Sequence, residues 1–377
     1  MSEGVRGSGE ALIDLAALRE NFAEARRCAG GREVIAVVKA DAYGHGAERI
    51  TRELVGAGCT RFAVANLDEA ASLRDAGIEA PILVFAGARD PSEAAEAAAR
   101  GLTPVIHSEG DLERVSRAAR AISRSVDVQV EVDTGMHRLG VPADAAADLI
   151  ERVIAEPGIA LEGVFTHLAR ADEPDLAPAR EQLRRFRGVL DALREAGVSP
   201  GLLHVANSAG LLAGDALFGE LPEVNAVRPG LMLFGVRPAP HLPGALRPVM
   251  TLRSRVVTLR PLRAGDAVGY GALHRAERET RIATLPIGYA DGVPVATSNR
   301  GEVLLRGRRF PIVGRVSMDA ITLDVGTYPV EVGDEAILFG ASEQGLLPVE
   351  EAAEAAHTLS YELLVRVGSR VQRRVRD

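Results

Sequence analysis

The chain has 377 residues, 47% of them hydrophobic and 25% charged, and its formal net charge is −8 at pH 7. This composition predicts a folded globular protein of about two domains and argues against nucleic-acid binding, which needs clustered basic residues. No stretch approaches the roughly 20 apolar residues of a membrane span and no secretion signal is evident, so we expect a cytoplasmic protein without membrane contact. The two cysteines, Cys28 and Cys59, form no CxxC pair and join no cluster with zinc-ligand spacing, so we expect neither a disulfide nor a metal.

Between residues 33 and 236, short β-branched runs alternate with helical patterns, which is typical of parallel βαβ units. Eight such runs are present: VIAVV (34–38), RFAVA (61–65), PILVF (81–85), TPVI (103–106), VDVQVEV (126–132), GVFT (163–166), LLHVA (202–206) and a run that begins at NAVRP (225). Eight parallel strands with intervening helices close most naturally into a (β/α)8 barrel. We therefore predict an α/β fold whose N-terminal part is such a barrel.

Two of the intervening helices are clear in the sequence. Asp68 is expected to begin a helix that ends at Gly77, shortly before the third run. Between residues 180 and 196 apolar residues recur at spacings of three and four, and Gly197 follows as a stop signal. These apolar residues are Leu183, Phe186, Leu190 and Leu193. The spacing predicts an amphipathic helix.

A proline-rich segment follows the last run. Prolines at positions 238, 240, 243 and 248 crowd into RPAPHLPGALRPVM, and their fixed φ angles and missing N–H donors suit a linker. Beyond the linker, short alternating runs such as RSRVVTLR and AITLDV are broken by Gly-Asp pairs at 265–266 and 333–334. We therefore predict two domains, a barrel over residues 1–240 and a mainly antiparallel β domain over residues 241–377.

Lys39 is the first candidate for chemistry. It lies in VVKADAYGHG, where the first barrel strand should end, and barrel active sites are built at the C-terminal ends of the strands. A lysine at a partly apolar barrel mouth can lose its proton and attack a carbonyl, so a Schiff base is chemically reasonable. An isolated lysine at a strand end would more simply be solvated. Tyr43 and the Gly44-His45-Gly46 turn favour the functional interpretation.

Two turns predict a phosphate site, because barrels commonly bind phosphate in the loops after the seventh and eighth strands. After the seventh strand comes Asn207-Ser208-Ala209-Gly210, with a hydroxyl and small residues. After the eighth comes Arg228-Pro229-Gly230-Leu231, where Gly230 lets backbone N–H groups approach an anion. Each could be an ordinary turn. Because both turns follow the expected strands, together they favour a phosphate site.

These pieces together resemble alanine racemase, a fold-type III pyridoxal-phosphate family with an N-terminal barrel and a C-terminal β domain. The resemblance covers nearly the whole chain. Its motifs are AVVKADAYGHG (36–46), VDTGMHRLG (132–140), FTHLARADE (165–173), HVANSAGLL (204–212), VRPGLMLFG (227–235), VGYGALH (268–274), PIGYADG (286–292) and GRVSMD (314–319). Eight motifs in the same order are hard to attribute to chance.

The resemblance implies two catalytic bases, Lys39 and Tyr270, of which Lys39 would also bind pyridoxal 5′-phosphate as a Schiff base. Two bases fit the reaction, because racemisation removes the α-proton from one face and replaces it on the other. The resemblance further implies a set of cofactor-binding residues: Lys39, Tyr43, His167, Ser208, Arg228, Gly230, Leu231 and Tyr361. Arg228 would face the pyridine nitrogen. Taken alone, His167 would be read as a core histidine and Tyr361 as a packed aromatic.

Substrate contacts also follow from the resemblance. Arg138 and the Met318 amide would receive the substrate carboxylate, while Tyr289 and Asp319 would line the entry. One departure concerns Glu131, which stands where several family members carry a carbamylated lysine beside the substrate-binding arginine. A carboxylate supplies the same sign of charge on a shorter arm. Alternatively, Glu131 is a strand residue that points elsewhere.

The sequence thus predicts a homodimeric enzyme that interconverts L-alanine and D-alanine for peptidoglycan precursors, with an active site shared between subunits. A racemase that acts on serine or basic amino acids is an alternative, because one methylene is worth only about 1 to 3 kcal/mol of discrimination. A fold-type III decarboxylase usually relies on a cysteine in the C-terminal domain, whereas both cysteines here precede residue 60. A non-catalytic pyridoxal-phosphate carrier resembles the barrel alone, and the added β domain with Tyr270 counts against it.

Overall fold

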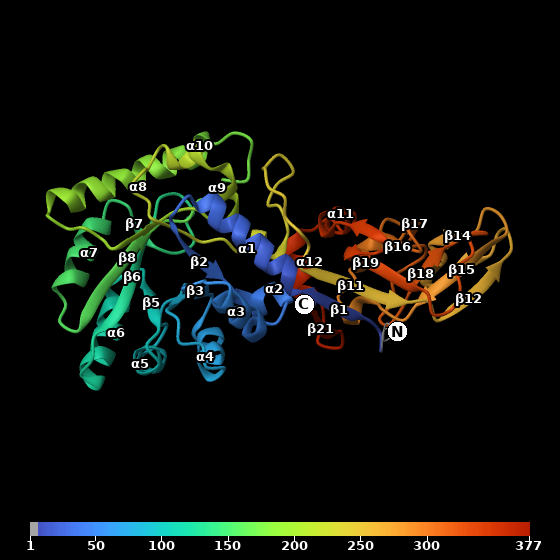
Figure 1. The fold of residues 1–377 in the computed structure, drawn as a ribbon, viewed down its shortest axis with the longest axis horizontal. Coiled ribbons are helices and arrows are strands. Elements are labelled where there is room, and N and C mark those ends of the chain that lie inside the picture. The colour runs from blue at the N-terminus through green and yellow to red at the C-terminus, as the bar shows by residue number, and fades with distance from the viewer. Residues whose placement is uncertain (1–6) are drawn as a thin grey trace.

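A barrel and a β-rich part follow one another along the long axis of the molecule (Figure 1). The computed structural model describes residues 7–377, so the first six residues of the predicted barrel domain lie outside the described part. The fold class predicted from the sequence, a (β/α)8 barrel followed by a mainly antiparallel β domain, is confirmed.

Eight parallel strands form the closed barrel. They are β2 (Glu33–Val37), β3 (Arg61–Val64), β4 (Ile82–Val84), β5 (Thr103–Ile106), β6 (Val126–Asp133), β8 (Ile159–Phe165), β9 (Leu202–His204) and β10 (Ala226–Val227). Neighbours pair in the order β5-β4-β3-β2-β10-β9-β8-β6, and the pairing of β5 with β6 closes the ring. A short strand, β7 (Val141–Pro142), adds to β6 outside the ring. The strand predicted at 163–166 begins earlier, at Ile159.

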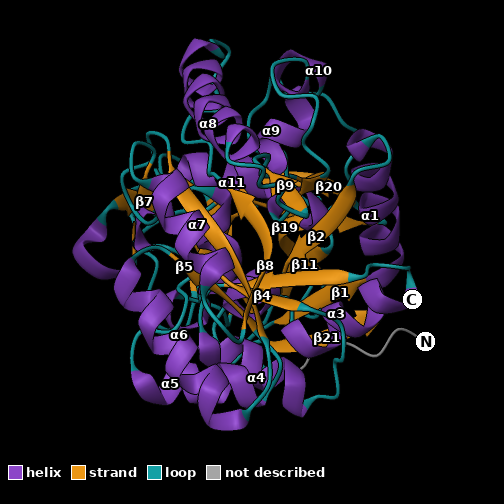
Figure 2. Cartoon of the chain, turned by 90° about the vertical axis from the view of Figure 1, so that its left-hand side faces the viewer, coloured by secondary structure: helices purple, strands orange, loops and turns teal. Residues whose placement is uncertain are grey.

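Helices surround the barrel strands (Figure 2). They are α1 (Leu15–Ala29), α3 (Ala47–Gly56), α4 (Leu67–Asp75), α5 (Pro91–Ala99), α6 (Glu109–Ile122), α7 (Ala146–Ala155), α8 (Ala177–Glu195), α9 (Ser208–Ala213) and α10 (Asp215–Phe218). In α8 the predicted apolar face is buried throughout: Leu183, Phe186, Leu190 and Leu193. None of the helices within residues 7–377 combines the length and apolar character that a membrane crossing requires.

The predicted start of α4 was wrong by one position. Asn66 caps this helix, since its Oδ1 accepts a hydrogen bond of 3.0 Å from the Glu69 amide, and Asp68 lies inside the first turn. Asparagine is favoured at N-caps, and the extended backbone of Asn66 places it there, directly before Leu67.

The second part is built on strands and two helices. Its main sheet has the order β17-β16-β19-β11-β1-β21, and β20 pairs with β19. These strands are β1 (Glu10–Asp14), β11 (Met250–Arg255), β16 (Glu302–Leu305), β17 (Arg308–Pro311), β19 (Glu335–Ser342), β20 (Gly345–Leu347) and β21 (Gln372–Arg376). A smaller sheet contains β12 (Thr258–Leu262), β15 (Thr280–Leu285) and β18 (Ile321–Asp324), and β13 (Ala267–Val268) pairs with β14 (His274–Arg275). The helices are α11 (Val349–Ala355) and α12 (Ser360–Arg366).

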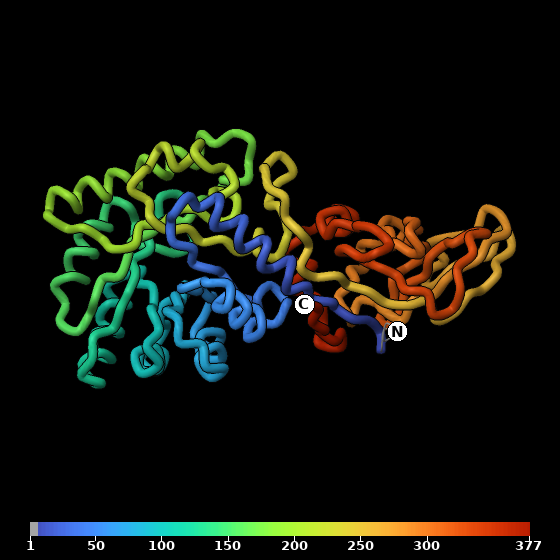
Figure 3. Tube along the Cα trace, in the orientation of Figure 1, coloured from blue at the N-terminus to red at the C-terminus, as the bar shows by residue number. Residues whose placement is uncertain are grey.

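The first strand of the chain belongs to the second part. β1 pairs antiparallel with β11 and parallel with β21, so it lies between strands that are about 240 and 360 positions later in the sequence. The Cα trace shows this blue segment leaving the barrel beside the red C-terminal segment (Figure 3). The expectation that residues 1–240 form one unit is therefore wrong for Glu10–Asp14. The boundary near residue 240 remains a prediction.

Candidate active site

A pocket at the mouth of the barrel brings together most of the residues that the sequence predicts for the site. It is lined by Val37, Lys39, Tyr43, Phe85, Arg138, His167, Asn207, Ser208, Ala209, Arg228, Gly230, Leu231 and Tyr361. All but one come from the barrel, at or beyond the carboxyl ends of its strands, and Tyr361 comes from α12 of the second part. Parallel strands of a barrel bring such positions together although they are far apart in the sequence.

The turn that follows β2 has an unusual backbone. Ala40, Asp41, Ala42 and Tyr43 all have φ between 52° and 53°, which makes the segment α2 (Lys39–Gly44) a single left-handed turn. Left-handed helical residues cost roughly 1 to 2 kcal/mol each for side chains with a Cβ atom. Such a cost persists only where the surrounding structure imposes the conformation, and this is common at functional sites.

Side chains around the turn supply that constraint. The Glu69 carboxylate accepts hydrogen bonds from the amides of Ala40 (2.8 Å) and Ala65 (2.7 Å). The buried His45 ring places Nδ1 2.9 Å from the Tyr43 carbonyl and 3.0 Å from the Ala42 carbonyl. Because a carbonyl can only accept, Nδ1 carries the proton. The turn holds Lys39 at its beginning and Tyr43 at its end in fixed positions.

Lys39 is the only lysine in the chain, although lysine and arginine together number 44. This uniqueness is a further signal in the sequence, beyond the motif that contains Lys39. Arginine cannot give up its proton at physiological pH, so the one position with a titratable amine is distinguished from every other basic position. Burial lowers the pKa of the Lys39 amine, and the positive charge of Arg138 lowers it further, while Glu69 opposes them.

Three hydroxyl groups line the side of the pocket next to Gly230. The Ser208 hydroxyl accepts hydrogen bonds from the amides of Gly230 (3.0 Å) and Met232 (3.3 Å). The Tyr43 and Tyr361 rings lie 6.3 Å apart between centroids. Burial raises the pKa of both phenols, so both remain hydrogen-bond donors at neutral pH. Donors that cluster beside a glycine suit an anion.

Arg228 contributes a buried positive charge to the same pocket. Its Nη1 donates to His204 Nδ1, and its Nη2 donates to the Thr166 carbonyl (2.9 Å) and faces His167 Nδ1 (3.3 Å). Burial lowers the pKa of Arg228 to about 10, so the side chain stays charged at neutral pH. Within residues 7–377 its Nε–H finds no hydrogen-bond partner, although the side chain is only 2% exposed. A donor of this kind is left for a ligand that enters the pocket.

The two histidines that touch Arg228 are neutral. Burial and the Arg228 charge lower the pKa of His167 to about 3, and the same causes hold the pKa of His204 well below its ordinary value. His204 was not singled out from the sequence. The signal that could have found His204 is a polar residue at the end of an apolar strand. In the structure the Phe165 ring stacks on the His204 ring, with centroids 4.7 Å apart.

Glu131 is buried at the end of β6, and the contact that the structure gives it is with His107, at 3.3 Å between Oε2 and Nε2. Arg138 is exposed and lies five positions beyond β6, in a loop that the Asp133 carboxylate organises by accepting from the amides of Gly135, Met136 and His137. In the described chain no ion pair joins Glu131 to Arg138. The proposed link between them stays a prediction.

Four predicted site residues lie outside the pocket, on the second part of the chain. Tyr270 is 70% exposed, Met318 51% and Tyr289 45%. Asp319 is also exposed, and its carboxylate accepts a hydrogen bond of 2.8 Å from Arg370. One chain alone therefore does not bring these four residues to the pocket that holds Lys39.

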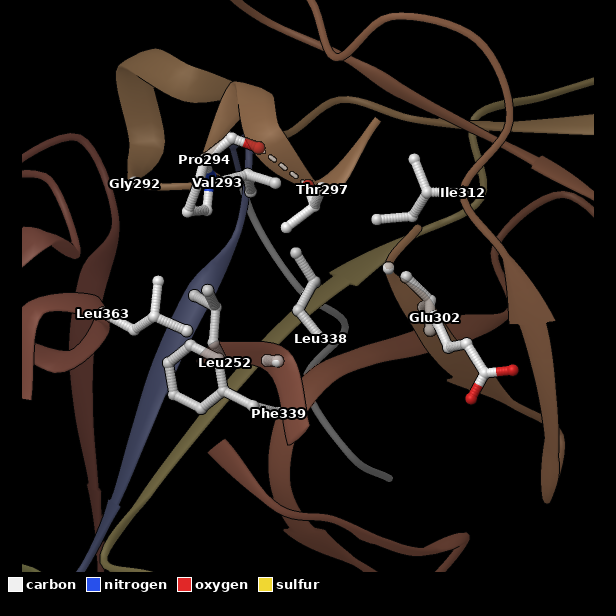
Figure 4. A pocket seen from close by; sticks show the side chains of 13 residues that line it. Leu252, Gly292, Val293, Pro294, Thr297, Glu302, Ile312, Leu338, Phe339 and Leu363 are labelled. Carbon is white, nitrogen blue, oxygen red and sulfur yellow. Dashed lines mark hydrogen bonds between the residues drawn. The ribbon is translucent and has the colours of Figure 1, made fainter. Parts of the chain in front are cut away.

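A second cavity lies inside the β-rich part, and Figure 4 shows its lining. Apolar side chains dominate it, among them Leu252, Leu338, Phe339 and Leu363. The Thr297 hydroxyl is already bonded to the Pro294 carbonyl at 2.7 Å, and the exposed Glu302 carboxylate extends away from the other side chains (Figure 4). This lining offers no group for catalysis. In addition, no cluster of His, Cys, Asp or Glu side chains in residues 7–377 could hold a metal ion.

Comparisons with known proteins agree along the whole chain. Residues 13–238 match the family model "Alanine racemase, N-terminal domain", and residues 249–375 match "Alanine racemase, C-terminal domain". The chain is 44% identical to an alanine racemase of Syntrophobacter fumaroxidans, over 94% of each chain. It is 40% identical to an alanine racemase of Desulforamulus reducens, over 96% of this chain and 97% of the relative.

The fold of the chain is also similar to solved structures over nearly its whole length. The alanine racemase of the D-cycloserine producer Streptomyces lavendulae superimposes with a TM-score of 0.92 at 37% identity, over 99% of this chain and 98% of that one. The biosynthetic alanine racemase of Pseudomonas aeruginosa superimposes with a TM-score of 0.89 at 38% identity, over 99% of this chain and 100% of that one. The Bacillus anthracis alanine racemase with bound L-Ala-P superimposes with a TM-score of 0.89 at 32% identity, over 100% of this chain and 96% of that one.

Proposed function

Because the chain belongs to the alanine racemase family of isomerases, we propose that it interconverts L-alanine and D-alanine with pyridoxal 5′-phosphate as its cofactor. The observation that carries this proposal is the barrel-mouth pocket, which is lined both by the only lysine of the chain and by a buried arginine whose Nε–H has no partner within residues 7–377. Pyridoxal 5′-phosphate, when bound, supplies an aldehyde carbon that combines with amines and a ring that draws electrons from the substrate α-carbon.

The residues present fit this cofactor at both ends. Arg228 Nε would donate to the pyridine nitrogen, and it satisfies an otherwise unpaired buried N–H. The hydroxyls of Tyr43, Ser208 and Tyr361 and the amides of Gly230 and Leu231 would hold the phosphate. Because a cation that keeps its protons would not protonate the ring nitrogen, Arg228 would make the bound ring a weaker electron sink. His167 would support Arg228 as its neutral neighbour.

Proton transfer would be shared between two bases. Because its pKa is lowered, the Lys39 amine can be uncharged and would take the α-proton of the substrate from one face. Tyr270 would act from the other face. Arg138 and the Met318 amide would bind the substrate carboxylate, while Tyr289 and Asp319 would line the entry.

The second base requires a second subunit. Tyr270 is 70% exposed and does not line the pocket of its own chain. In a symmetric homodimer each subunit would present Tyr270, Met318, Tyr289 and Asp319 to the pocket of the other. Such a dimer would supply D-alanine for peptidoglycan precursors in the cytoplasm.

Racemisation rates over a panel of L-amino acids, with the visible absorbance of the purified protein recorded, test this proposal. Alanine should react fastest, and mixtures that start from either enantiomer should converge on equal amounts, because enantiomers have the same free energy. Faster turnover of serine or a basic amino acid would favour the broader racemase. Release of carbon dioxide would favour a decarboxylase, and cofactor binding without turnover would favour a carrier.

A further inference from the structure

A line of hydrogen bonds leads from Arg228 through the interior of the barrel. Arg228 Nη1 bonds to His204 Nδ1, His204 Nε2 to Gln129 Oε1 at 2.7 Å, and Gln129 Nε2 to Glu162 Oε2 at 2.8 Å. Arg228, His204 and Gln129 are at most 2% exposed. The four residues come from the loop after β10 and from β9, β6 and β8, which are consecutive strands of the barrel.

The direction of every bond in this line is fixed by its two ends. A guanidinium can only donate, so His204 must accept at Nδ1 and carry its proton on Nε2. The Nε2–H then requires an acceptor, which sets the orientation of the Gln129 amide with its oxygen towards His204. The amide N–H₂ therefore faces Glu162, whose carboxylate can only accept. In all three bonds the donor is on the side of the Arg228 cation and the acceptor on the side of the Glu162 anion.

A backbone irregularity sets the position of Glu162. In the pairing of β6 with β8, Val128 is opposite Leu161 and Gln129 is opposite Gly163, which leaves Glu162 as an extra residue in β8. Bulges re-aim a side chain and are uncommon between parallel strands. A Cβ atom on the neighbouring Gly163 would lie 2.7 Å from the Leu202 carbonyl oxygen, so glycine permits the close approach of β8 and β9 here.

Arg228 needs a counter-charge that its direct contacts do not supply. Its partners in the described chain are imidazole rings, carbonyl groups and the face of the Phe165 ring, and the Glu131 charge acts on it through space without a hydrogen bond. A buried cation without compensation is strongly unfavourable. We propose that Glu162 is the counter-ion of Arg228, relayed by Gln129 and His204, and that Gln129 is the positioning residue that keeps His204 in the tautomer that Arg228 requires.

The far end of the relay is itself anchored. Glu162 Oε1 accepts from Arg61 Nη1, and Arg61 Nε donates to Glu33 at 2.9 Å. Charges therefore alternate along the line, from the Glu33 carboxylate through Arg61 and Glu162 to Arg228. Because hydrogen bonds in a row polarise one another, the four charged groups stabilise a common geometry. The consequence for the cofactor, a ring-nitrogen partner that is fixed in place, rests on the proposed function.

The relay predicts a definite state of one histidine ring in the cofactor-free protein. In ¹⁵N spectra of the imidazole groups, His204 should be neutral with its proton on Nε2, and Gln129→Met should change the His204 signals more than those of any other histidine. A His204 that is protonated, or that carries its proton on Nδ1, overturns the proposal. This measurement on the unsubstituted chain needs no variant to fold.

A double-substitution cycle tests the coupling in the same cofactor-free protein. Glu162→Gln destabilises the chain by two routes, loss of the Arg61 ion pair and loss of the relay. In a Gln129→Met background only the first route remains, so its effect on the unfolding equilibrium constant should be smaller by a factor on the order of ten. In a Gln182→Met background the effect should keep its full size, because Gln182 is also buried but lies outside the relay.

An unchanged effect of Glu162→Gln in the Gln129→Met background overturns the relay. So does an equal reduction in the Gln182→Met background, because it would show that the coupling is not specific to the line. Neither measurement depends on pyridoxal 5′-phosphate, and a protein that fails to racemise alanine can therefore still pass both. Failure of the proposed function and failure of the relay are distinguishable on this basis.

Discussion

A Cβ atom placed on Gly230 would lie 2.3 Å from the phenolic oxygen of Tyr43. Gly230 has a negative φ of −124°, so an alanine there is excluded by this contact and not by its backbone. Tyr43 is buried against Phe234, with ring centroids 4.9 Å apart, and the free space next to it is the pocket that it lines. The close approach joins the turn after β2 to the loop after β10.

We expect Gly230→Ala to displace Tyr43, lower the unfolding free energy by about 1 to 3 kcal/mol and weaken binding of pyridoxal 5′-phosphate. Chemical unfolding and a cofactor titration followed by absorbance would measure both effects. Gly188→Ala, on the exposed face of α8 with no atom near the new methyl group, is the matched control. It should raise the unfolding free energy by roughly 0.5 to 1 kcal/mol. Wild-type cofactor affinity in Gly230→Ala would contradict the role of this contact.

Borohydride reduction of the protein with bound pyridoxal 5′-phosphate should label Lys39 alone. The chain has no other lysine, so the only competing amine is the N-terminus. Peptide mapping by mass spectrometry would locate the label, and Lys39→Ala should lose both the label and the visible absorbance. A label at the N-terminus with Lys39 unmodified would refute the assignment.

Glu131→Gln tests whether this carboxylate supports substrate binding through Arg138. If it does, the KM for alanine should rise more than kcat falls, because positioning of the carboxylate partner is what the variant loses. Since Lys39 is the only lysine, no carbamate can form beside Arg138, and activity should not depend on added bicarbonate. Unaltered kinetic constants together with lower stability would show that Glu131 serves only His107, its contact at 3.3 Å.

Reassortment of two inactive variants tests whether Tyr270 acts across a dimer interface. Lys39→Ala and Tyr270→Phe, dissociated together and allowed to reassemble, should form about half mixed dimers, each with one intact site of two. Activity should therefore return to about a quarter of the wild-type value. If Tyr270 served the Lys39 of its own chain, every site would carry a lesion, and mixed dimers would remain inactive.

Acid should destabilise the protein already between pH 6.5 and 5. Burial lowers the pKa of His45 to about 4, of His167 to about 3 and of His204 well below its ordinary value. Below the unfolded value near 6.5, the unfolded chain binds protons at these positions and the folded chain does not, so the unfolding free energy falls with pH. The contribution of the three groups to the pH dependence vanishes only well above the unfolded value, at about pH 7.5 and higher.

Denaturant unfolding of the cofactor-free protein at several pH values would show this slope. His45→Asn retains an N–H donor for the turn at Ala42 and Tyr43 but removes one titrating group, so its slope should be shallower than that of the wild type. A wild-type unfolding free energy that stays constant from pH 6.5 to 5 would contradict the assignment of three neutral buried histidines.

The sequence predicted the barrel well because each strand has a local signal of β-branched residues bounded by turn residues. It missed the early start of β8, where Glu162 interrupts the apolar run before Gly163. It also missed the pairing of β1 with β11 and β21, since strands so far apart in sequence leave no local pattern. The left-handed turn at Ala40–Tyr43 contradicts ordinary propensity, and only the contacts of Glu69 and His45 explain it.

The candidate site was predictable to the extent that it lies in the loops after the barrel strands. Lys39, Ser208 and Arg228 each follow a strand, so topology alone brings them together. Residues that support them from within the barrel, such as His204 and Gln129, have no motif of their own and become recognisable only through their hydrogen bonds. Tyr270 lies on the second part and does not line the pocket of its own chain, so its role as a base stays a proposal.

The position of β1 between β11 and β21 has a consequence for the order in which the protein is made. A ribosome makes Glu10–Asp14 about 360 positions before Gln372–Arg376, yet the two segments are adjacent strands. The barrel strands can pair while synthesis continues, but β1 must wait until β21 has been made. Until then β1 lacks one neighbour, and its unpaired edge is open to other chains. The second sheet can therefore be completed only after the whole barrel has been made.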